Sequence, residues 1–545
     1  MPTPPSIAEP GSSVARPSRL AKLLRLLNPA HSHTAYTATV LLMISASLSR
    51  LIGLVRVKYI ALVFGRGVQA DAFVAAFQLP DMIAYFLVGG AASITFVTIL
   101  TQYRDTGREE QGERSLSVIL TTMVLVLGGA ILLAEWGAPW CIHWLFPGFD
   151  AAKAALCVHL TRILLPAQLC FFAGGVFGAV LLVRKQFTIQ AVAPLIYSLG
   201  TILGGVFLAH RYGVVSLAYG TVAGALLGPF LLNAAGAWRV GTRYRPILDW
   251  RDEGFREWVR LSVPLMVGVS LVTADNWIIS HYASHSAGAV ALMSYAKQLF
   301  TAPMAVLAQA AGAASMPFFA RLWAREKRYE FALEVAESVS RVAALGLLAA
   351  SAMIALAPAL VDLILLGGRF HAADTAVTAT YFAIFSVSLF LWSAQAIYAR
   401  AFYAAGNTLL PMLAGTVVTL LSLPVYAYLF RTHGAMGLAI ASDIGITMQT
   451  VSLAALLHAR RMVSLASLDA RELGRCVVAG VCGGGAVWLA LWLATHAITM
   501  RGRLMDAGEL AVGATLWLLV TGRMLDALGS ALPRVALERL GLRAV

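Results

Sequence analysis

Two arginines stand in the middle of the first long apolar stretch of the chain. The stretch runs from about residue 36 to 64 and contains Arg50 and Arg56. A charge at the centre of a bilayer costs about 2.5–3.5 kcal/mol on insertion scales, so such residues usually face a bundle interior or a wet cavity. Two guanidinium groups facing one cavity could grip phosphates through forked hydrogen bonds. Alternatively, each long side chain could lie along lipid and place its charge at the interface.

The spacing of the two arginines limits how they could act together. On a straight helix, six residues place them ~9 Å apart along the axis and about 120° apart around it. They converge on one cavity only if the cavity is wide or the helix bends, and Gly53 between them could allow a bend. Asp71 stands at the head of the next apolar stretch. It could be the counter-ion of the arginines when no substrate is present, or a cap on the second helix.

Polar residues also interrupt the apolar stretches of the second half. One stretch carries Asp275 and Asn276, and the next carries Lys297 and Gln298. We predict that Lys297 and Gln298 contribute to a substrate site at the centre of the molecule. Asp275 is either a buried, paired or protonated acid, or part of a site for a coupling ion or proton. Asn407 is the second residue that we assign to such a coupling site.

The composition excludes a soluble globular protein. Of the 545 residues, 59% are hydrophobic and 12% are charged, whereas soluble domains have about 25% charged residues. Windows of about 20 apolar residues can cross ~30 Å of hydrocarbon as helices. They lack the alternation of barrel strands. The sequence therefore predicts an all-α polytopic membrane protein with fourteen transmembrane helices. The windows lie near residues 36–64, 72–100, 115–146, 154–182, 188–209, 213–238, 258–282, 288–320, 333–366, 374–404, 408–430, 434–457, 474–497 and 507–530.

The net charge of +14 reflects membrane topology and does not indicate nucleic-acid binding. Basic residues gather in the N-terminal tail and in every second connection, and the connections between carry few. By the positive-inside rule, both termini are cytoplasmic, which agrees with an even number of helices. The residues are Arg16, Arg19, Lys22 and Arg25; Arg104, Arg108 and Arg114; Arg184 and Lys185; Arg239, Arg243, Arg245, Arg251, Arg256 and Arg260; Arg321, Arg325, Lys327 and Arg328; and Arg460, Arg461, Arg471 and Arg475.

A short internal repeat predicts two lobes. Gly90-Ala91-Ala92-Ser93 recurs as Gly312-Ala313-Ala314-Ser315, six helices later, and both are followed by a charged connection. An even offset gives two six-helix lobes in the same orientation, pseudo-symmetric about an axis along the membrane normal. The predicted divisions are a disordered cytoplasmic tail (1–35), the first lobe (36–238), a basic cytoplasmic linker (239–257), the second lobe (258–457), a cytoplasmic loop (458–473), two extra helices (474–530) and a cytoplasmic tail (531–545).

No motif for catalysis or metal binding stands in the chain. Nothing resembles a Walker loop, a catalytic dyad or a metal cluster. We therefore expect a protein that is not an enzyme and uses no cofactor or metal, driven by a substrate gradient, a monovalent cation or the membrane potential. The five cysteines have the character of small core residues. The spacing leaves open whether Cys141 and Cys157, on either side of a predicted external loop, form a disulfide.

Several motifs resemble the MurJ (MviN) lipid II flippases of the multidrug/oligosaccharidyl-lipid/polysaccharide exporter superfamily. They occur in order and span roughly residues 36 to 530. The motifs are Ser49-Arg50 with Gly53 and Arg56, Phe64-Gly65, Asp71-Ala72-Phe73, Leu79-Pro80, Phe146-Pro147-Gly148-Phe149, Ala193-Pro194, Phe402-Tyr403-Ala404, Asn407-Thr408 and Pro411. The resemblance implies two six-helix lobes around a central cationic cavity. It also implies a protein of the bacterial cytoplasmic (inner) membrane that moves lipid II from the cytoplasmic to the periplasmic leaflet for peptidoglycan synthesis.

The chain departs from the family at three positions. Ala84-Tyr85 and Gln298 stand where the family usually has arginines, and Gly89 stands where it often has an acid. We predict that Lys297 substitutes for the arginine at Gln298, with Arg50, Arg56 and Asp71 as the other substrate-binding residues. The departures leave two cargoes open, lipid II or another polyprenyl-linked saccharide. The alternatives in function are a cation-coupled exporter of the multidrug type and a non-transporting scaffold of a cell-envelope complex.

The last two helices fall outside the six-plus-six repeat. A polyprenyl tail is too long for a polar cavity and needs an apolar groove that is continuous with lipid. Gly483, Gly484 and Gly485 would permit close approach of such a chain. The helices therefore form either the groove for the lipid tail or an accessory pair for stability or partner binding.

Overall fold

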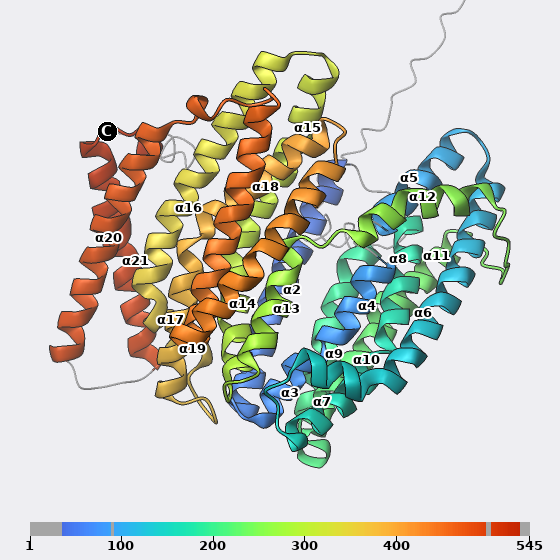
Figure 1. Cartoon of the computed structure of the whole chain (residues 1–545), viewed down its shortest axis with the longest axis horizontal. Coiled ribbons are helices and arrows are strands. Elements are labelled where there is room, and N and C mark those ends of the chain that lie inside the picture. Colours follow the sequence, from blue (N-terminus) through green and yellow to red (C-terminus); the bar gives the residue numbers. More distant parts are fainter. Residues whose placement is uncertain (1–34, 89–91, 498–502, 535–545) are drawn as a thin grey trace, which may run out of the picture.

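The chain folds into two groups of helices that lie side by side, as the computed structural model shows (Figure 1). The structure describes residues 35–88, 92–497 and 503–534. These residues are mostly helical, and their one isolated β-bridge joins Gly367 and Phe370. The predicted all-α fold is confirmed. The tail of residues 1–34 and the repeat residues Gly89, Gly90 and Ala91 lie outside the described residues.

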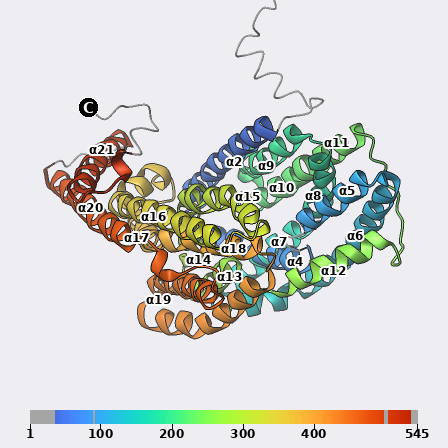
Figure 2. The ribbon, with the colours of Figure 1, turned by 90° about the horizontal axis from the view of Figure 1, so that it is seen from above.

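The first lobe consists of α2 (Ala35–Phe64), α3 (Val68–Ala76), α4 (Gln78–Val88), α5 (Ala92–Asp105), α6 (Glu109–Leu145), α7 (Ala151–Leu164), α8 (Ala167–Val183), α9 (Phe187–Tyr212), α10 (Val215–Ala225), the π-helix η1 (Leu226–Leu232) and α11 (Asn233–Arg239). The second half of the chain contains α12 (Glu253–Val267), α13 (Leu271–Ala283), α14 (Ala289–Met304), the π-helix η2 (Ala305–Ala310), α15 (Ala311–Ala324), α16 (Arg328–Leu365), α17 (Ala372–Val387), α18 (Leu389–Ala404), α19 (Leu409–Ala459) and the short η3 (Leu465–Ser467). The second lobe begins at α13. Two terminal helices, α20 (Ala470–Ala497) and α21 (Arg503–Ala527), follow. They lie beside α16, away from the first lobe (Figure 2).

The number of membrane spans is compatible with fourteen. Among the described residues, 10 helices are long and apolar enough to cross a membrane, or up to 11 if the bent pair α17–α18 is one span. The 51 residues of α19 include a break at Gly434, where φ is 60°, so this element can supply two spans. The two stretches left over are α2, which carries Arg50, Arg56 and Lys58, and α12–α13, which is broken between Val267 and Leu271.

The third long helix of each lobe displays the pseudo-symmetry most clearly. α6 and α16 contain 37 and 38 residues. Each has a proline close to its C-terminal end. Pro139 lies in α6, which ends at Leu145, and Pro358 lies at nearly the same distance from the end of α16, which is Leu365. The shared length and proline position support the internal repeat independently of the small-residue motif.

The segment that links the lobes is attached to the first lobe. Arg114 of α6 forms an ion pair of 2.9 Å with Asp249 of the linker, and α12 packs on α4, α5 and α6. The backbone N–H of Arg251 and the Arg114 guanidinium hold the pKa of the Asp249 carboxyl below its usual range. The chain passes to the second lobe at Gly268, between α12 and α13, where a side chain would collide with Met412.

Paired glycines allow α9 and α10 to cross in backbone contact. Gly200 and Gly204 of α9 face Gly220 and Gly224 of α10, and each pair has the spacing of a GxxxG motif. A Cβ built on Gly220 would lie 2.4 Å from the backbone oxygen of Gly200. Membrane helices associate largely through such packing, since lipid supplies no hydrophobic force between them. The crossing therefore depends on the absence of side chains at these four positions.

We expect Gly220→Ala to destabilise the protein. Overpacking typically costs about 1–3 kcal/mol, which outweighs the gain of up to about 1 kcal/mol from alanine in a helix. The matched control is Gly129→Ala in α6, because a Cβ there would meet nothing within 4 Å. Thermal unfolding in detergent should show a lower midpoint for Gly220→Ala and an unchanged or higher one for Gly129→Ala. Equal midpoints would contradict the close crossing.

Candidate functional site

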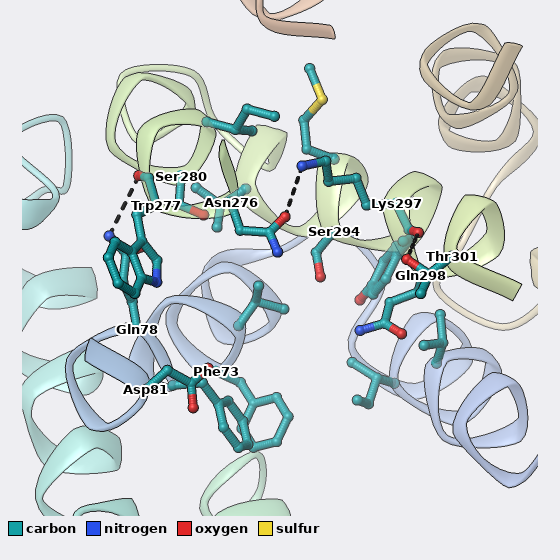
Figure 3. A pocket seen from close by; sticks show the side chains of 18 of the residues that line it. Phe73, Gln78, Asp81, Asn276, Trp277, Ser280, Ser294, Lys297, Gln298 and Thr301 are labelled. Carbon is teal, nitrogen blue, oxygen red and sulfur yellow. Dashed lines mark hydrogen bonds between the residues drawn. The ribbon is translucent and has the colours of Figure 1, made fainter. Parts of the chain in front are cut away.

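A cavity of about 640 Å³ lies between the two lobes. The first lobe lines it with side chains from α2, α3, α4 and α9, and the second lobe with side chains from α13 and α14. In Figure 3, Phe73 and Asp81 of the first lobe lie across the cavity from Asn276 and Ser294 of the second. A polar cavity of this size at a lobe interface is a typical place for a ligand.

A second pocket of about 240 Å³ adjoins the central cavity. Arg50 and Pro194 line only this pocket, whereas Arg56 and Gln298 line both. The two arginines therefore face the interior between the lobes, and both side chains are half-buried. Arg50 also reaches across the interface, where its Nη1 donates a hydrogen bond of 3.4 Å to the carbonyl oxygen of Thr301.

Arg56 has two neighbours that sequence reasoning missed. Its guanidinium hydrogen-bonds the hydroxyl of Tyr197, and the carboxylate of Asp81 lies within electrostatic range of the same hydroxyl. Both residues line the central cavity. Asp81 directly follows Pro80 within an apolar segment. An acid within a membrane segment was the signal that could have revealed it.

Lys297 is held by an ion pair with Asp275. The ammonium also donates to Asn276 Oδ1 at 2.8 Å. The Asp275 carboxylate, which is 2% exposed, accepts further hydrogen bonds from the hydroxyls of Tyr426 and Ser442. Asp275 is thus a buried and paired acid in this structure, and Lys297 presents a charge that is already neutralised to the cavity.

Asn407 does not join this network. It lies in the connection between α18 and α19, where its Oδ1 accepts a hydrogen bond of 3.1 Å from the backbone N–H of Leu410. The hydrogen bonds to Asp275 come from Lys297, Tyr426 and Ser442 instead. The structure therefore does not bring together the two residues that the sequence suggested for a coupling ion.

Asp71 joins the two lobes, so both sequence-based interpretations of it are wrong. Its carboxylate is fully buried and accepts 3.0 Å and 2.9 Å hydrogen bonds at Oδ2 from the Lys153 ammonium and the Gly288 N–H. Oδ1 accepts a 2.9 Å bond from the N–H of Ala291. Its partner is Lys153, not an arginine of α2. It caps α14 of the other lobe, whereas Gly67 precedes its own helix. Sequence reasoning could not foresee hydrogen bonds to amides of α14, more than 200 residues away.

Other contacts between the lobes gather at the same end of the molecule, which we call the closed end. Lys58 Nζ donates a hydrogen bond of 2.6 Å to the carbonyl oxygen of Ile364, in the last turn of α16. The guanidinium of Arg66 forms an ion pair of 2.9 Å with Asp374 in the first turn of α17. The hydroxyl of Tyr295 donates to the carbonyl oxygen of Gly65 at 3.0 Å. The lobes are thus fastened at this end by charges and by helix termini.

A family model described as "Lipid II flippase MurJ" matches residues 60–501 of the chain. The chain belongs to this family. The resemblance drawn from the motifs is confirmed. A relative from Vibrio cholerae, named "Probable lipid II flippase MurJ", is 25% identical over 493 residues, which is 87% of this chain and 94% of the relative. "Lipid II flippase MurJ" of Burkholderia cenocepacia is 26% identical over 422 residues, covering 74% of this chain and 80% of the relative.

Solved structures share the fold. A structure described as "Lipid II flippase MurJ, inward closed conformation" superposes with a TM-score of 0.74 at 18% identity, covering 90% of this chain and 99% of that chain. An inward-facing multidrug transporter of the MATE family superposes with a TM-score of 0.63 at 16% identity, covering 78% of this chain and 98% of that chain. The protein is therefore a multi-pass membrane protein with the fold of these transporters.

The positions where this chain departs from its family have different surroundings. Gln298 lines both pockets, so an uncharged amide stands where the family usually has an arginine. Tyr85, next to Ala84, lines the cavity and donates a hydrogen bond of 2.8 Å to the carbonyl oxygen of Gly268.

The structure also answers whether Cys141 and Cys157 form a disulfide, because both are free thiols.

We expect Asp71→Asn to loosen the closed end. Leaving Lys153 buried without its partner should cost about 3–5 kcal/mol, the usual effect of breaking a buried ion pair. Hydrogen exchange should then become faster at the first turn of α14, because asparagine keeps only one acceptor oxygen and the N–H of either Gly288 or Ala291 loses its partner. The matched control is Asp150→Asn, since Asp150 caps only α7 of its own lobe through the Lys153 N–H. Unchanged exchange in α14 would rule out the cap across the lobes.

Proposed function

We propose that the protein flips lipid II, the polyprenyl-pyrophosphate-linked precursor of peptidoglycan, across the bacterial cytoplasmic membrane by alternating access. The family match over residues 60–501 carries this proposal. It is supported by a polar cavity between two lobes, with Arg56 on its wall and Arg50 in the adjoining pocket. Guanidinium groups bind phosphates through paired hydrogen bonds, so these two side chains are suited to a pyrophosphate.

The positive-inside rule gives the orientation in this proposal. The basic connections, such as residues 239–257, lie at the end opposite the closed end (Figure 1). If that basic end is cytoplasmic, both termini are cytoplasmic as well. The closed end then faces the periplasm, and the structure is closed toward the side on which the cargo is released. Transport requires the contacts of Asp71, Lys58 and Arg66 at that end to open.

The energy source in this proposal is a substrate gradient, a monovalent cation or the membrane potential. Asp275 remains the candidate coupling acid, together with Tyr426 and Ser442 as its hydroxyl partners. In this structure the Lys297 ammonium already balances the Asp275 charge. A coupling cation at Asp275 would therefore have to displace Lys297 into the cavity, where that ammonium would become available to phosphate.

The terminal helices provide a surface for the polyprenyl tail in this proposal. α20 and α21 pack on α16 and expose apolar side chains, among them Val481 and Trp488 at 68% and 62%. The three glycines of α20 differ in their surroundings. A side chain on Gly483 would collide with Thr521 of α21, and one on Gly484 would touch Ser351 of α16. Gly485 faces open space, so it is the one of the three that a polyprenyl chain could reach.

The two other functions have less support. A MATE transporter shares the fold with the lower TM-score of 0.63, and the family model that matches most of the chain is that of the flippases. A non-transporting scaffold would need no cavity lined by Arg56, Asp81 and Gln298. Rescue of a bacterial strain depleted of its own lipid II flippase would separate the flippase from both alternatives. Failure to rescue, with normal membrane insertion, would count against lipid II as the cargo.

We expect Arg56→Ala to slow flipping by about 10- to 100-fold, the usual value of a hydrogen bond to a charged group. Arg56→Lys should retain part of the rate, because an ammonium keeps the positive charge but cannot make the paired hydrogen bonds of a guanidinium. The matched control is Arg460→Ala, an exposed arginine in a basic connection. Flipping is measured in proteoliposomes by the exposure of a labelled headgroup to an impermeant reagent. A wild-type rate for Arg56→Ala would contradict its role in binding phosphate.

A bulky side chain at Gly485 tests the tail-binding surface. We expect Gly485→Leu to slow the flipping of substrates with a long polyprenyl chain and to spare short-chain analogues, because only the long chain reaches α20. Gly484→Leu is the comparison, since its side chain points at Ser351 and should lower stability with both substrates alike. An equal effect of Gly485→Leu on both chain lengths would argue for an accessory role of α20 and α21.

A further inference from the structure

Asp81 places a negative charge in a cavity that is proposed to bind phosphate. The residue lies in the first turn of α4 and lines the 640 Å³ cavity, where its side chain is exposed (Figure 3). Within residues 35–88, 92–497 and 503–534, Asp81 takes part in none of the ion pairs. A carboxylate in this position repels an anion, so a purely anionic cargo does not explain it.

The charges along the cavity wall are balanced. Arg56, Asp81 and Lys297 all line it, and Lys297 is paired with Asp275 behind the wall. This leaves one positive group, Arg56, and one negative group, Asp81, facing the same space. Charges on the two sides of a binding interface are usually complementary, and a mismatched charge discriminates against a ligand. The matching ligand carries a cation as well as a phosphate.

Aromatic rings surround the same space. Phe73 and Phe77 lie edge to face with 5.1 Å between ring centroids, and Tyr85 and Trp277 lie edge to face at 5.5 Å. All four line the cavity with Asp81. The faces of aromatic rings attract ammonium ions, and a carboxylate beside such rings adds a charged hydrogen-bond acceptor. Rings and acid together form surroundings that suit a primary ammonium group.

We propose that Asp81 and these rings form a second subsite in the cavity, which binds a primary ammonium group on the peptide or sugar part of the transported headgroup. This subsite rests on the proposed function and is separate from the phosphate-binding arginines. Arg56 and Arg50 receive the pyrophosphate, and Asp81 receives the ammonium. The protein thereby selects headgroups that carry both charges over headgroups that are only anionic.

Two water-soluble analogues of the cargo test the subsite. Both are short-chain polyprenyl-pyrophosphate disaccharide peptides, one with a free primary amine on the peptide and one with that amine N-acetylated. Their binding to the full chain in detergent is measured by calorimetry, and their flipping in proteoliposomes is measured in parallel. We expect the free amine to bind about tenfold more tightly, as one hydrogen bond to a charged group would give.

Variants assign the preference to Asp81. Asp81→Asn and Asp81→Ser should both bind the two analogues equally, and Asp81→Glu should keep a preference for the free amine. Either of the first two variants suffices if the other does not fold. The matched control is Glu330→Gln, because Glu330, in the first turn of α16, pairs with Lys327 and does not line the cavity. It should retain the wild-type preference.

Three results would overturn the subsite. They are equal binding of both analogues by the wild type, a preference that survives Asp81→Asn and Asp81→Ser, and an equal loss of both analogues in these variants. The last result would assign Asp81 to a proton or a free cation, or to the structure of the cavity. A preference for the amine without any flipping would support the subsite and refute the proposed function. The two failures are therefore distinguishable.

Discussion

The buried carboxylate of Asp71 is the interaction on which the arrangement of the lobes depends. A charge that is fully removed from water is tolerated only when it is paired and hydrogen-bonded. Asp71 meets this condition with the Lys153 ammonium in its own lobe and with two N–H groups of α14 in the other. Lys58 and Arg66 add contacts at the ends of α16 and α17. Asp71 and Lys58 each meet a helix terminus of the second lobe whose dipole favours their charge, whereas Arg66 pairs with the Asp374 carboxylate in the first turn of α17.

The same helices carry the closed end and the cavity. α14 begins at the amide groups that Asp71 caps, and it continues to Lys297, Gln298 and Thr301 on the cavity wall. α2 carries Arg50 and Arg56 toward the interior and places Lys58 against α16. A ligand that pulls on Arg56 or Gln298 therefore acts on helices whose other contacts hold the closed end. The cavity and the closed end are therefore physically connected through α2 and α14, so binding at one could shift the equilibrium at the other. The break at Gly268 leaves α13 separate from α12, which stays fastened to the first lobe.

The sequence predicts the class of this protein well because bilayer physics acts on composition. Apolar windows, alternating basic connections and a charge inside the first stretch all follow from the cost of burying polar groups in lipid. Partners across the lobe interface are beyond such reasoning. Asp71 is 217 residues from Gly288, and only the folded arrangement of α3 against α14 reveals that it caps another lobe. The same holds for Gly484 and Gly485, neighbours in sequence that face α16 and open space. Asp81 was overlooked although its signal was present, since an acid beside a proline resembles an ordinary start of a helix.

The distribution of charge between the lobes has a further consequence for transport. The first lobe supplies the unpaired charges of the cavity, Arg56 and Asp81, whereas the second supplies Asn276, Ser294, Gln298 and the internally paired Lys297. A charged ligand loses more when it leaves an ionic partner than when it leaves a neutral hydrogen-bonding group. When the lobes move apart, the headgroup should therefore stay with the first lobe. Its hydrogen bonds to amides and hydroxyls of the second lobe can be replaced by hydrogen bonds to water at little cost in free energy. Replacing the family's arginine by Gln298 fits this asymmetry, since a neutral side chain on the moving wall holds the cargo less strongly than a cation would.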